Sequence, residues 1–382
     1  MTLLKLTNSP KRYAWGSVDL IPQLLGTEPD GKPQAELWFG THPSSPSEVL
    51  DKDGGKLADR IEPLGFLVKF LAASAPLSIQ AHPSREHASM RFAEGYPGYS
   101  DPNHKPEAIV AVSEFEALCG FRPVATIQQD LEALSEADAT FSPWLLALAS
   151  EGLRGATSWA LEASCEHVET LLAAANSLGP HGELLKKISQ EHPGDVGLMV
   201  ALLMNHVLLR PGQALYLPAG NIHAYLSGLG VEVMAASDNV LRGGLTKKPI
   251  DRPELMQVLD FSELTKPLVE TRELTSGLTE YQLAAEDFSL YRLEPSGAGM
   301  LIDVALKGRA IAVCVAGEIV ISTSKEESLS LRLQTPPISR FSAVAPATLR
   351  WVSGSSQTAG QHRGLYLLEE QLAAAGHHDF LS

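Results

Sequence analysis

The chain has 382 residues, a formal net charge of −15, 44% hydrophobic residues and 20% charged residues. This length suffices for two or three domains, and the modest charged fraction argues against disorder. Nonspecific nucleic-acid binding requires clusters of Lys and Arg, so an acidic chain is a poor candidate for it, and we expect no nucleic-acid partner. A small phosphate could still bind in a locally basic pocket.

The three cysteines, Cys119, Cys165 and Cys314, lie far apart in the sequence. Without a CxxC pair, neither a disulfide framework nor a cysteine-type zinc finger is indicated. The first 15 residues lack the apolar segment of a signal peptide, and no run of about 18 apolar residues predicts a membrane span. We therefore expect a cytoplasmic monomer that does not associate with membranes.

Short apolar runs separated by Pro and Gly predict a β-rich region up to residue 123, with strands at 66–73, 76–82 and 108–112. Beyond it, apolar residues recur at three- and four-residue spacing within 127–135, 144–153, 167–178 and 183–190. This spacing is typical of amphipathic helices and predicts a helical insert at 124–207.

Strand character returns at 213–218 and 231–235, and a mixed stretch with helical turns follows to about residue 265. The last third alternates again at 310–322 and 341–352, with Gly317 as a turn. The overall pattern predicts β-sandwich domains that are interrupted by one helical domain.

Residues 212–227 (GQALYLPAGNIHAYLS) resemble the second motif of cupins, with Ser227 where Asn is usual. Pro218 would end a strand, Gly220 would permit a tight turn, and the next strand would carry His223 into a barrel mouth. An imidazole there is well placed to bind a metal, although a hydrogen-bonded core histidine is the alternative. Residues 342–348 (SAVAPAT) have the Pro but no following His, which indicates a second cupin without a metal.

Further ligand candidates lie upstream of His223. Gln80 and His82 would share one face of a strand, although a lone Gln is more often a surface or capping residue. Glu107 is the natural carboxylate candidate, and an ion pair with Lys105 or Arg122 is its alternative role. Two imidazoles, a carboxylate and an amide oxygen suit zinc, but a two-histidine, one-carboxylate iron site would use similar residues. Four other histidines, His42, His87, His167 and His206, have no comparable context.

Several ordered segments resemble type I mannose-6-phosphate isomerases over nearly the whole length of the chain. These segments are YAWGS at 13–17, SIQAHP at 78–83, NHKPE at 103–107, CGFR at 119–122, HAYL at 223–226 and EVMAASDNVLRGGLT at 232–246. The resemblance implies one Zn²⁺ per subunit, a catalytic arginine at Arg242, and zinc ligands at Gln80, His82, Glu107 and His223. Gly243 and Lys247 depart from the Ala and Pro that are common in the family, and neither change removes a catalytic group.

The family interconverts mannose 6-phosphate and fructose 6-phosphate through a cis-enediol, so the resemblance implies a small sugar-phosphate substrate. Ser78, Lys105 and Lys248 are candidates to contact its phosphate or hydroxyls. The general base is open among Glu232, Lys105 and Asp238, and Asp238 could instead only cap a turn.

Two aromatic residues each have two possible environments. Trp15 is either pocket wall or core, and Tyr225, on the face of His223, either lines the pocket or packs in the core.

The fold class expected is mainly β with cupin-type β-sandwich or jelly-roll barrels and a helical insert. The domains would be a catalytic cupin (1–123 and 208–265), the insert (124–207) and a C-terminal cupin-like domain without metal (266–382).

Two other functions share part of this pattern. An iron-dependent cupin dioxygenase would use the same histidines but would not require Arg242 or the pair Lys105 and Lys248. A non-catalytic sugar-binding cupin would bind its ligand without turnover and should lack an intact ligand set. The presence of all four ligand candidates and of Arg242 favours the isomerase.

Overall fold

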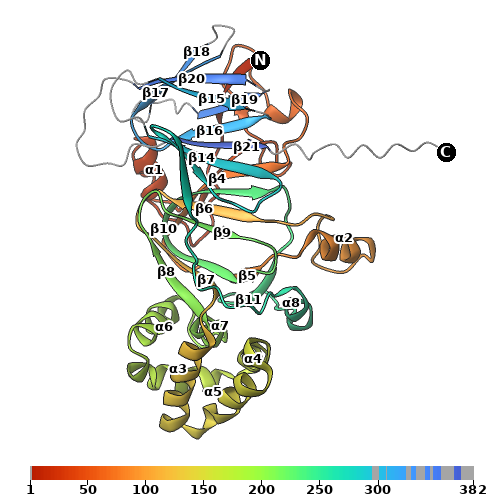
Figure 1. The fold of residues 1–382 in the computed structure, drawn as a ribbon, viewed down its shortest axis with the longest axis vertical. Coiled ribbons are helices and arrows are strands. Elements are labelled where there is room, and N and C mark those ends of the chain that lie inside the picture. The colour runs from red at the N-terminus through yellow and green to blue at the C-terminus, as the bar shows by residue number, and fades with distance from the viewer. Residues whose placement is uncertain are drawn as a thin grey trace, which may run out of the picture.

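The computed structural model describes residues 2–294, 301–306, 308–323, 328–332, 340–344, 347–353 and 365–370. Antiparallel sheets form the upper and middle parts of the molecule, and a group of helices forms its lower end (Figure 1). Within the described ranges, no helix is both long and apolar enough to cross a membrane. The expectation of a mainly β chain with an inserted group of helices is confirmed at this level.

The sheet that carries the candidate site has nine strands. Its central strand, β10 (His223–Ala235), pairs antiparallel with β4 (Phe66–Ala73), β5 (Ile79–Ala81), β6 (Glu107–Ala111) and β7 (Phe115–Phe121). Outside these lie β2 (Glu36–Phe39), β11 (Leu241–Gly244), β9 (Ala214–Leu217) and β8 (Met204–Leu209). Every strand predicted for this region is present, and β10 begins at His223 rather than at residue 231.

The helices lie between β7 and β8, as expected. They are α3 (Val124–Ala137), α4 (Ser142–Glu162), α5 (Cys165–Ala173), α6 (Pro180–Glu191) and α7 (Gly197–Leu202), with 3₁₀ turns at Ala139–Phe141 and Ala175–Leu178. Within the expected insert, 124–207, the helices end at Leu202 and strand β8 begins at Met204. Residues 204–209 pair with β7, and this pairing places them in the sheet.

Shorter elements surround the nine-stranded sheet. The mixed stretch before residue 265 contains α8 (Arg252–Val258), in agreement with the expected helical turns. The sequence did not predict the elements α1 (Leu20–Leu25), a 3₁₀ turn (Leu57–Asp59) and α2 (Arg85–Ala93). In Figure 1, α2 projects from the side of the sheet, with α8 beneath it.

The last third forms two further antiparallel sheets. The eight-stranded sheet runs in the order β12 (Thr271–Thr275), β13 (Leu278–Tyr281), β14 (Phe288–Leu293), β21 (Leu365–Glu370), β16 (Ala310–Cys314), β19 (Arg340–Val344), β1 (Thr2–Thr7) and β3 (Glu48–Val49). The four-stranded sheet contains β15 (Leu301–Leu306), β20 (Ala347–Ser353), β17 (Glu318–Thr323) and β18 (Ser328–Arg332). Gly317 has a φ of 78° and separates β16 from β17, which belong to different sheets.

The first strand differs from the expected division of the chain. β1 pairs with β19 near the other end of the sequence, so residues 2–7 belong to the eight-stranded sheet. No sequence pattern predicted this pairing, because β strands can pair across any length of chain. The C-terminal proline of the second cupin-like segment, Pro346, lies outside the described residues.

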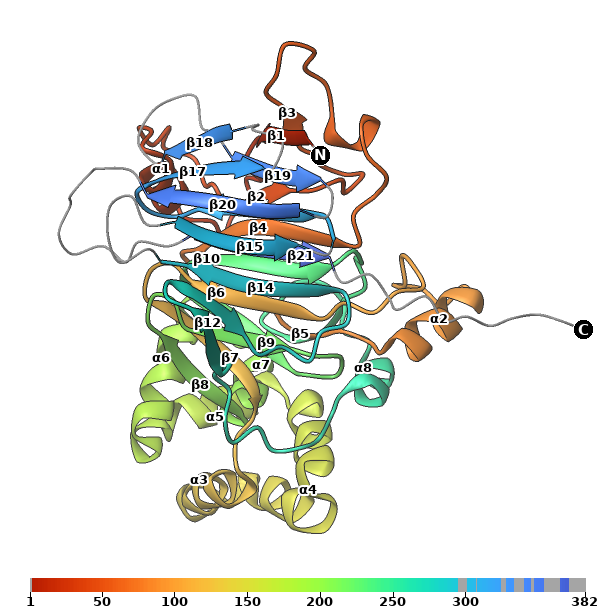
Figure 2. The ribbon, with the colours of Figure 1, turned by 45° about the horizontal axis from the view of Figure 1, so that its top comes forward.

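Alternation along the strands divides the nine-stranded sheet into two faces. On β4, Val68 and Phe70 point to a core shared with Phe288 and Ile311 of the eight-stranded sheet, which lies across it (Figure 2). The residue between them, Lys69, therefore points to the opposite face. That face carries the charged side chains described next.

Candidate functional site

Three adjacent strands place Gln80, His223 and Arg242 side by side. In the pairing register, Gln80 of β5 lies opposite His223 of β10 and opposite Arg242 of β11. The flanking residues Ile79 and Leu241 pack against the helices. Because side chains alternate along a strand, the three polar residues point away from the helices, toward a common cavity.

The turn before His223 has the geometry that the motif predicts. β9 ends at Leu217, and Gly220 adopts a φ of 78°, which favours glycine. A side chain at Gly220 would also collide, because its Cβ would lie 2.9 Å from the Val258 carbonyl oxygen. The Gly220 N–H donates to the His82 carbonyl oxygen at 2.8 Å, so this turn ties the two histidine segments together.

Both histidines have one ring nitrogen fixed by the backbone. His82 Nδ1 lies 2.8 Å from the Asn239 carbonyl oxygen, and His223 Nδ1 lies 3.1 Å from the Asn221 carbonyl oxygen. A carbonyl only accepts hydrogen bonds, so each Nδ1 carries a proton, and in the neutral form of each ring Nε2 keeps its lone pair. Burial lowers the pKa of His82 to about 4, which also favours the neutral ring.

The two Nε2 atoms converge with the carboxylate of Glu107. His82 Nε2 lies 3.4 Å from Glu107 Oε1, and His223 Nε2 lies 3.5 Å from Oε2. All three side chains are buried, and their ligand atoms lie within 4.8 Å of one another. Among the described residues, His82 Nε2 and Glu107 Oε2 have no hydrogen-bond partner. Lone pairs that face each other with no proton between them can be satisfied by a bound cation. The two imidazole nitrogens and the carboxylate are therefore a chemically suitable donor set for a metal ion.

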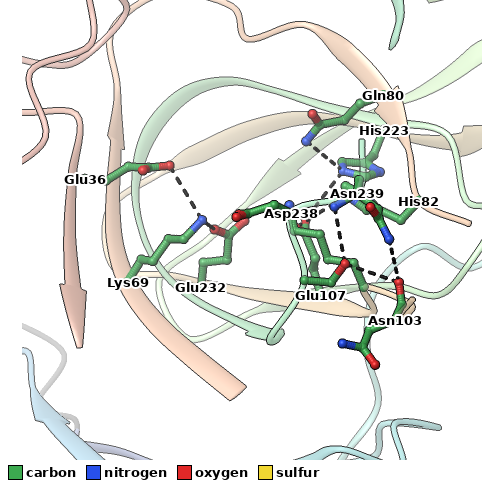
Figure 3. A network of polar contacts seen from close by, with 12 residues as sticks. Glu36, Lys69, Gln80, His82, Asn103, Glu107, His223, Glu232, Asp238 and Asn239 are labelled. Carbon is green, nitrogen blue, oxygen red and sulfur yellow. Dashed lines mark hydrogen bonds and ion pairs between the residues drawn. The ribbon is translucent and has the colours of Figure 1, made fainter. Parts of the chain in front are cut away.

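Gln80 completes the cluster from the cavity side. Its Nε2 lies 3.3 Å from His223 Nε2, and a half-turn of the amide would bring its oxygen to the same position (Figure 3). Lys105 Nζ lies 3.0 Å from Glu107 Oε1, so the ion pair considered as an alternative role for Glu107 exists beside the cluster. Burial would raise the pKa of Glu107, but Lys105 and His82 outweigh it and hold that pKa well below its usual value.

A cavity of about 800 Å³ opens beside this cluster. Every candidate residue named from the sequence lines it except His82 and His223, which are buried against Glu107. The candidates on its wall are Trp15, Ser78, Gln80, Lys105, Glu107, Tyr225, Glu232, Asp238, Arg242 and Lys248. Trp15 lines the cavity and also packs on the core beside Tyr225, so both of its expected environments are present.

A second charged group on the cavity wall was missed in the sequence. Lys69 Nζ lies 3.1 Å from Glu232 Oε2 and 3.8 Å from Glu36 Oε1, and all three side chains are buried. Trp38 Nε1 donates to Glu36 Oε2 at 2.8 Å, and Lys69 Nζ lies 5.1 Å from the centre of a Trp38 ring. In Figure 3, Glu36 and Lys69 lie on one side of Glu232 and Asp238, and His82 and His223 lie on the other.

The protonation of this group follows from its burial and charges. Burial lowers the pKa of Lys69, but Glu36, Glu232 and Glu107 outweigh it and raise that pKa overall. Burial raises the pKa of Glu232; Lys69 opposes this rise, and Glu107 adds to it. One signal in the sequence could have revealed Lys69, namely a single lysine within the apolar strand FLVKFLAA.

Asp238 lines the cavity and lies beside His42, for which the sequence indicated no role at the site. His42 Nε2 lies 3.3 Å from Asp238 Oδ2. The hydrogen bond from His42 is the main cause of a lowered pKa of Asp238, and burial opposes it. The other three histidines without context lie away from the cavity and contact Glu254, Ser164 and Glu116.

β11 and the loop after it supply cations that no carboxylate among the described residues neutralises. Arg242 is half-buried, and burial lowers the pKa of its guanidinium. Arg242, Lys247 and Lys248 line the cavity, and none forms an ion pair within the described residues. In contrast, Lys69 and Lys105 are matched by carboxylates. This edge of the cavity is therefore suited to bind an anion.

Comparisons with known proteins identify the family of the chain. Residues 3–124 match the family described as "Phosphomannose isomerase type I, catalytic domain". Mannose-6-phosphate isomerase of Escherichia coli K12 is 35% identical, over 91% of this chain and 96% of that protein. The human mannose-6-phosphate isomerase is 33% identical, over 83% of this chain and 88% of that protein. Crystal structures of mutants of phosphomannose isomerase from Salmonella typhimurium include one with a TM-score of 0.85 and 30% identity, covering 97% of this chain and all of that one. The chain belongs to the type I mannose-6-phosphate isomerase family.

Proposed function

We propose that this chain interconverts mannose 6-phosphate and fructose 6-phosphate at the cavity beside Glu107. The observation that carries the proposal is the convergence of two imidazole nitrogens and a carboxylate at the wall of a cavity, whose cations Arg242 and Lys248 form no ion pair within the described residues. Membership of the isomerase family supports the same activity. Neither the iron-dependent dioxygenase nor the non-catalytic sugar-binding cupin is favoured.

Gln80, His82, Glu107 and His223 would hold one Zn²⁺ per subunit. Imidazole nitrogens with carboxylate and amide oxygens suit zinc, and the Nδ1 contacts of both histidines fix the rings for coordination. When bound, the ion would supply a positive charge that stabilises oxygens on which negative charge develops. The family resemblance, rather than the donor set alone, favours zinc over other divalent ions.

The chain's own residues would position the sugar phosphate and move its protons. After ring opening, a base takes the proton at C2 of the aldose, and a proton returns to C1 of the cis-enediol. Glu232 is our preferred base, because its raised pKa brings it closer to neutral pH. Lys105 remains a candidate, whereas the lowered pKa of Asp238 makes it a weaker base.

Arg242 would place a fixed positive charge near the enediol oxygens. The exposed Lys248 and the cavity residue Ser78 would contact the phosphate, and Trp15 and Tyr225 would shape the pocket wall. Arg242 and Lys248 have no carboxylate partner among the described residues, which supports roles toward an anionic substrate.

We further propose that the sheets form cupin-type jelly-roll barrels. The catalytic barrel would contain residues 1–123 and 208–265, and the helical insert would contain residues 124–207. The C-terminal cupin-like domain without metal would contain residues 266–382, and β1 from the first segment pairs with its strand β19. A cytoplasmic monomer without nucleic-acid partners remains our prediction.

A coupled assay with mannose 6-phosphate tests the proposed function. The purified chain is measured before chelation, after chelation and after zinc is restored, with Gln80→Ala beside it. Turnover should disappear on chelation and return with zinc, and Gln80→Ala should bind zinc more weakly. The matched control is Gln128→Ala, at an exposed position of α3. A folded, zinc-loaded wild type without turnover would exclude mannose 6-phosphate as the substrate.

A further inference from the structure

The loop that follows β11 contains a strained residue. Leu245 has a φ of 52°, and among the described residues it is the only non-glycine with positive φ. This conformation costs a leucine about 1–2 kcal/mol, so surrounding contacts must hold it in place. The loop connects Arg242 to Lys248, and both of these line the cavity. The conformation of Leu245 therefore affects where these two cations lie.

One carboxylate holds the backbone on both sides of the strain. Asp195, in the turn between α6 and α7, accepts hydrogen bonds from the Leu245 N–H on Oδ1 and from the Thr246 N–H on Oδ2, both at 2.9 Å. Its Oδ1 also accepts from the Gly197 N–H at 2.7 Å. Each oxygen of Asp195 thus binds the loop directly, and the two amides are consecutive.

Close packing joins the same two segments. A Cβ on Gly197 would lie 2.4 Å from Leu245 N, and a Cβ on Gly244 would lie 2.3 Å from Gly197 Cα. The Leu245 side chain is 2% exposed and packs in the core with the helices. The start of α7 and the loop therefore touch through their backbones, and little space is left for the loop to shift.

We propose that Asp195 is a positioning residue for the isomerase, because its carboxylate holds residues 244–246 so that Arg242 and Lys248 face the cavity. Asp195 does not line the cavity, so it acts through the loop rather than on the substrate. Arg242 lies on β11 directly before the held residues, and Lys248 follows them in the loop. Neither cation has a carboxylate partner of its own within the described chain, so the backbone of β11 and of the loop sets their positions. The inference rests on the roles proposed above for Arg242 and Lys248.

Two substitutions test it in the full-length, zinc-loaded protein. Asp195→Ala removes both acceptors, and we expect kcat/KM for mannose 6-phosphate to fall about 10- to 100-fold, the loss expected from a displacement of about 1 Å. Asp195→Asn keeps one acceptor and should lose less; it carries the test if the alanine variant does not fold. The matched control is Asp138→Ala, because Asp138 accepts from the Thr140 N–H at 2.9 Å at a helix start far from the loop.

Amide hydrogen exchange gives a readout that is independent of turnover. The Leu245 and Thr246 amides should exchange faster in both Asp195 variants than in the wild type or in Asp138→Ala, while zinc affinity stays unchanged. A kcat/KM within twofold of wild type, equal protection of both amides, or an equal rate loss in Asp138→Ala would overturn the proposal. If the zinc-loaded wild type lacks turnover, the proposed function fails, but the exchange comparison still decides whether Asp195 holds the loop.

Discussion

His82 donates from Nδ1 to the carbonyl oxygen of Asn239 at 2.8 Å, so a backbone atom of the 237–239 turn sets the orientation of a candidate metal ligand. Asp101 in turn fixes this turn. Its carboxylate accepts from Ser237 Oγ and from the Asp238 N–H, both at 2.9 Å. Its carbonyl oxygen accepts from Asn239 Nδ2 at 2.8 Å.

Asp101→Ala should therefore weaken metal binding without removing a ligand. Loss of a group that orients a ligand typically costs about 10- to 100-fold in affinity, and we expect a rise of this size in the zinc dissociation constant. Competition with a chromogenic chelator measures it. Asp51→Ala is the control, since Asp51 organises an exposed turn with Arg60 away from the cavity. Equal zinc affinity in Asp101→Ala and wild type would contradict the prediction.

The sequence predicts the ligand cluster because each of its parts has a local signal. The turn chemistry of Pro218 and Gly220 identifies His223, and the two-residue spacing of Gln80 and His82 places both on one strand face. The family resemblance then predicts that Arg242 is the catalytic arginine. These signals need only a few neighbouring residues each, so they can be read before the chain is folded.

The rest of the site depends on contacts between distant segments. Lys69 is held by Glu36 and Glu232, which are far from it in the sequence, and Asp195 reaches Leu245 from a different region of the chain. No periodicity encodes these pairs. The pairing of β1 with β19 escaped prediction for the same reason, because strand partners depend on the whole topology.

Lys69→Met should destabilise the fold, because it leaves Glu36 and Glu232 buried without their cation. Breaking a buried ion pair by removing one partner typically costs about 3–5 kcal/mol. The raised pKa of Glu232 should rise further in the variant. A carboxyl with a higher pKa in the folded chain stabilises the fold at low pH, and that stability is lost as pH rises through the folded value.

The stability deficit of Lys69→Met should accordingly be larger at pH 8 than at pH 5, as measured by urea unfolding. Adding Glu232→Gln should recover part of the loss at pH 8, because it removes one of the uncompensated charges. The exposed Lys32→Met serves as the control and should show no such pH dependence. A deficit that is constant between these pH values would argue against the charge account.

The contacts that Glu116 makes between α6 and the sheet should stabilise the fold in a pH-dependent way. Its carboxylate contacts Lys187 of α6, His206 of β8 at 2.9 Å and Ser227 of β10 at 3.1 Å. The hydrogen bond from His206 is the largest cause that lowers the pKa of Glu116 from 4.5 to about 2. A depressed folded pKa contributes stability above the unfolded value, and that contribution is lost as pH falls from about 4.5 through about 2.

Glu116→Gln should therefore have a lower Tm than wild type at pH 7, and the two should converge as pH falls below 4. Differential scanning calorimetry across this range measures the gap. Glu132→Gln is the control, because Glu132 is exposed on α3 and its side chain accepts a hydrogen bond only from Gln128 within the described chain. Parallel Tm curves for Glu116→Gln and wild type would show that the contacts of Glu116 contribute no pH-dependent stability.

Arg242→Ala should separate catalysis from metal binding. Arg242 lies opposite Gln80 in the strand register, but its side chain forms no hydrogen bond or ion pair with the groups that converge on Glu107 in the described part of the chain, so its removal should leave the zinc content unchanged. Loss of a fixed charge that stabilises developing oxyanion charge typically lowers kcat about 10²- to 10³-fold, and we expect a decrease of that order. Steady-state kinetics with mannose 6-phosphate, combined with metal analysis of the same sample, measures both quantities. Arg252→Ala, at the start of α8, is the control because its exposed side chain does not line the cavity. If Arg242→Ala lost zinc in proportion to activity, the arginine would act on the metal cluster rather than on the sugar; if it kept full activity, it would have no part in the reaction.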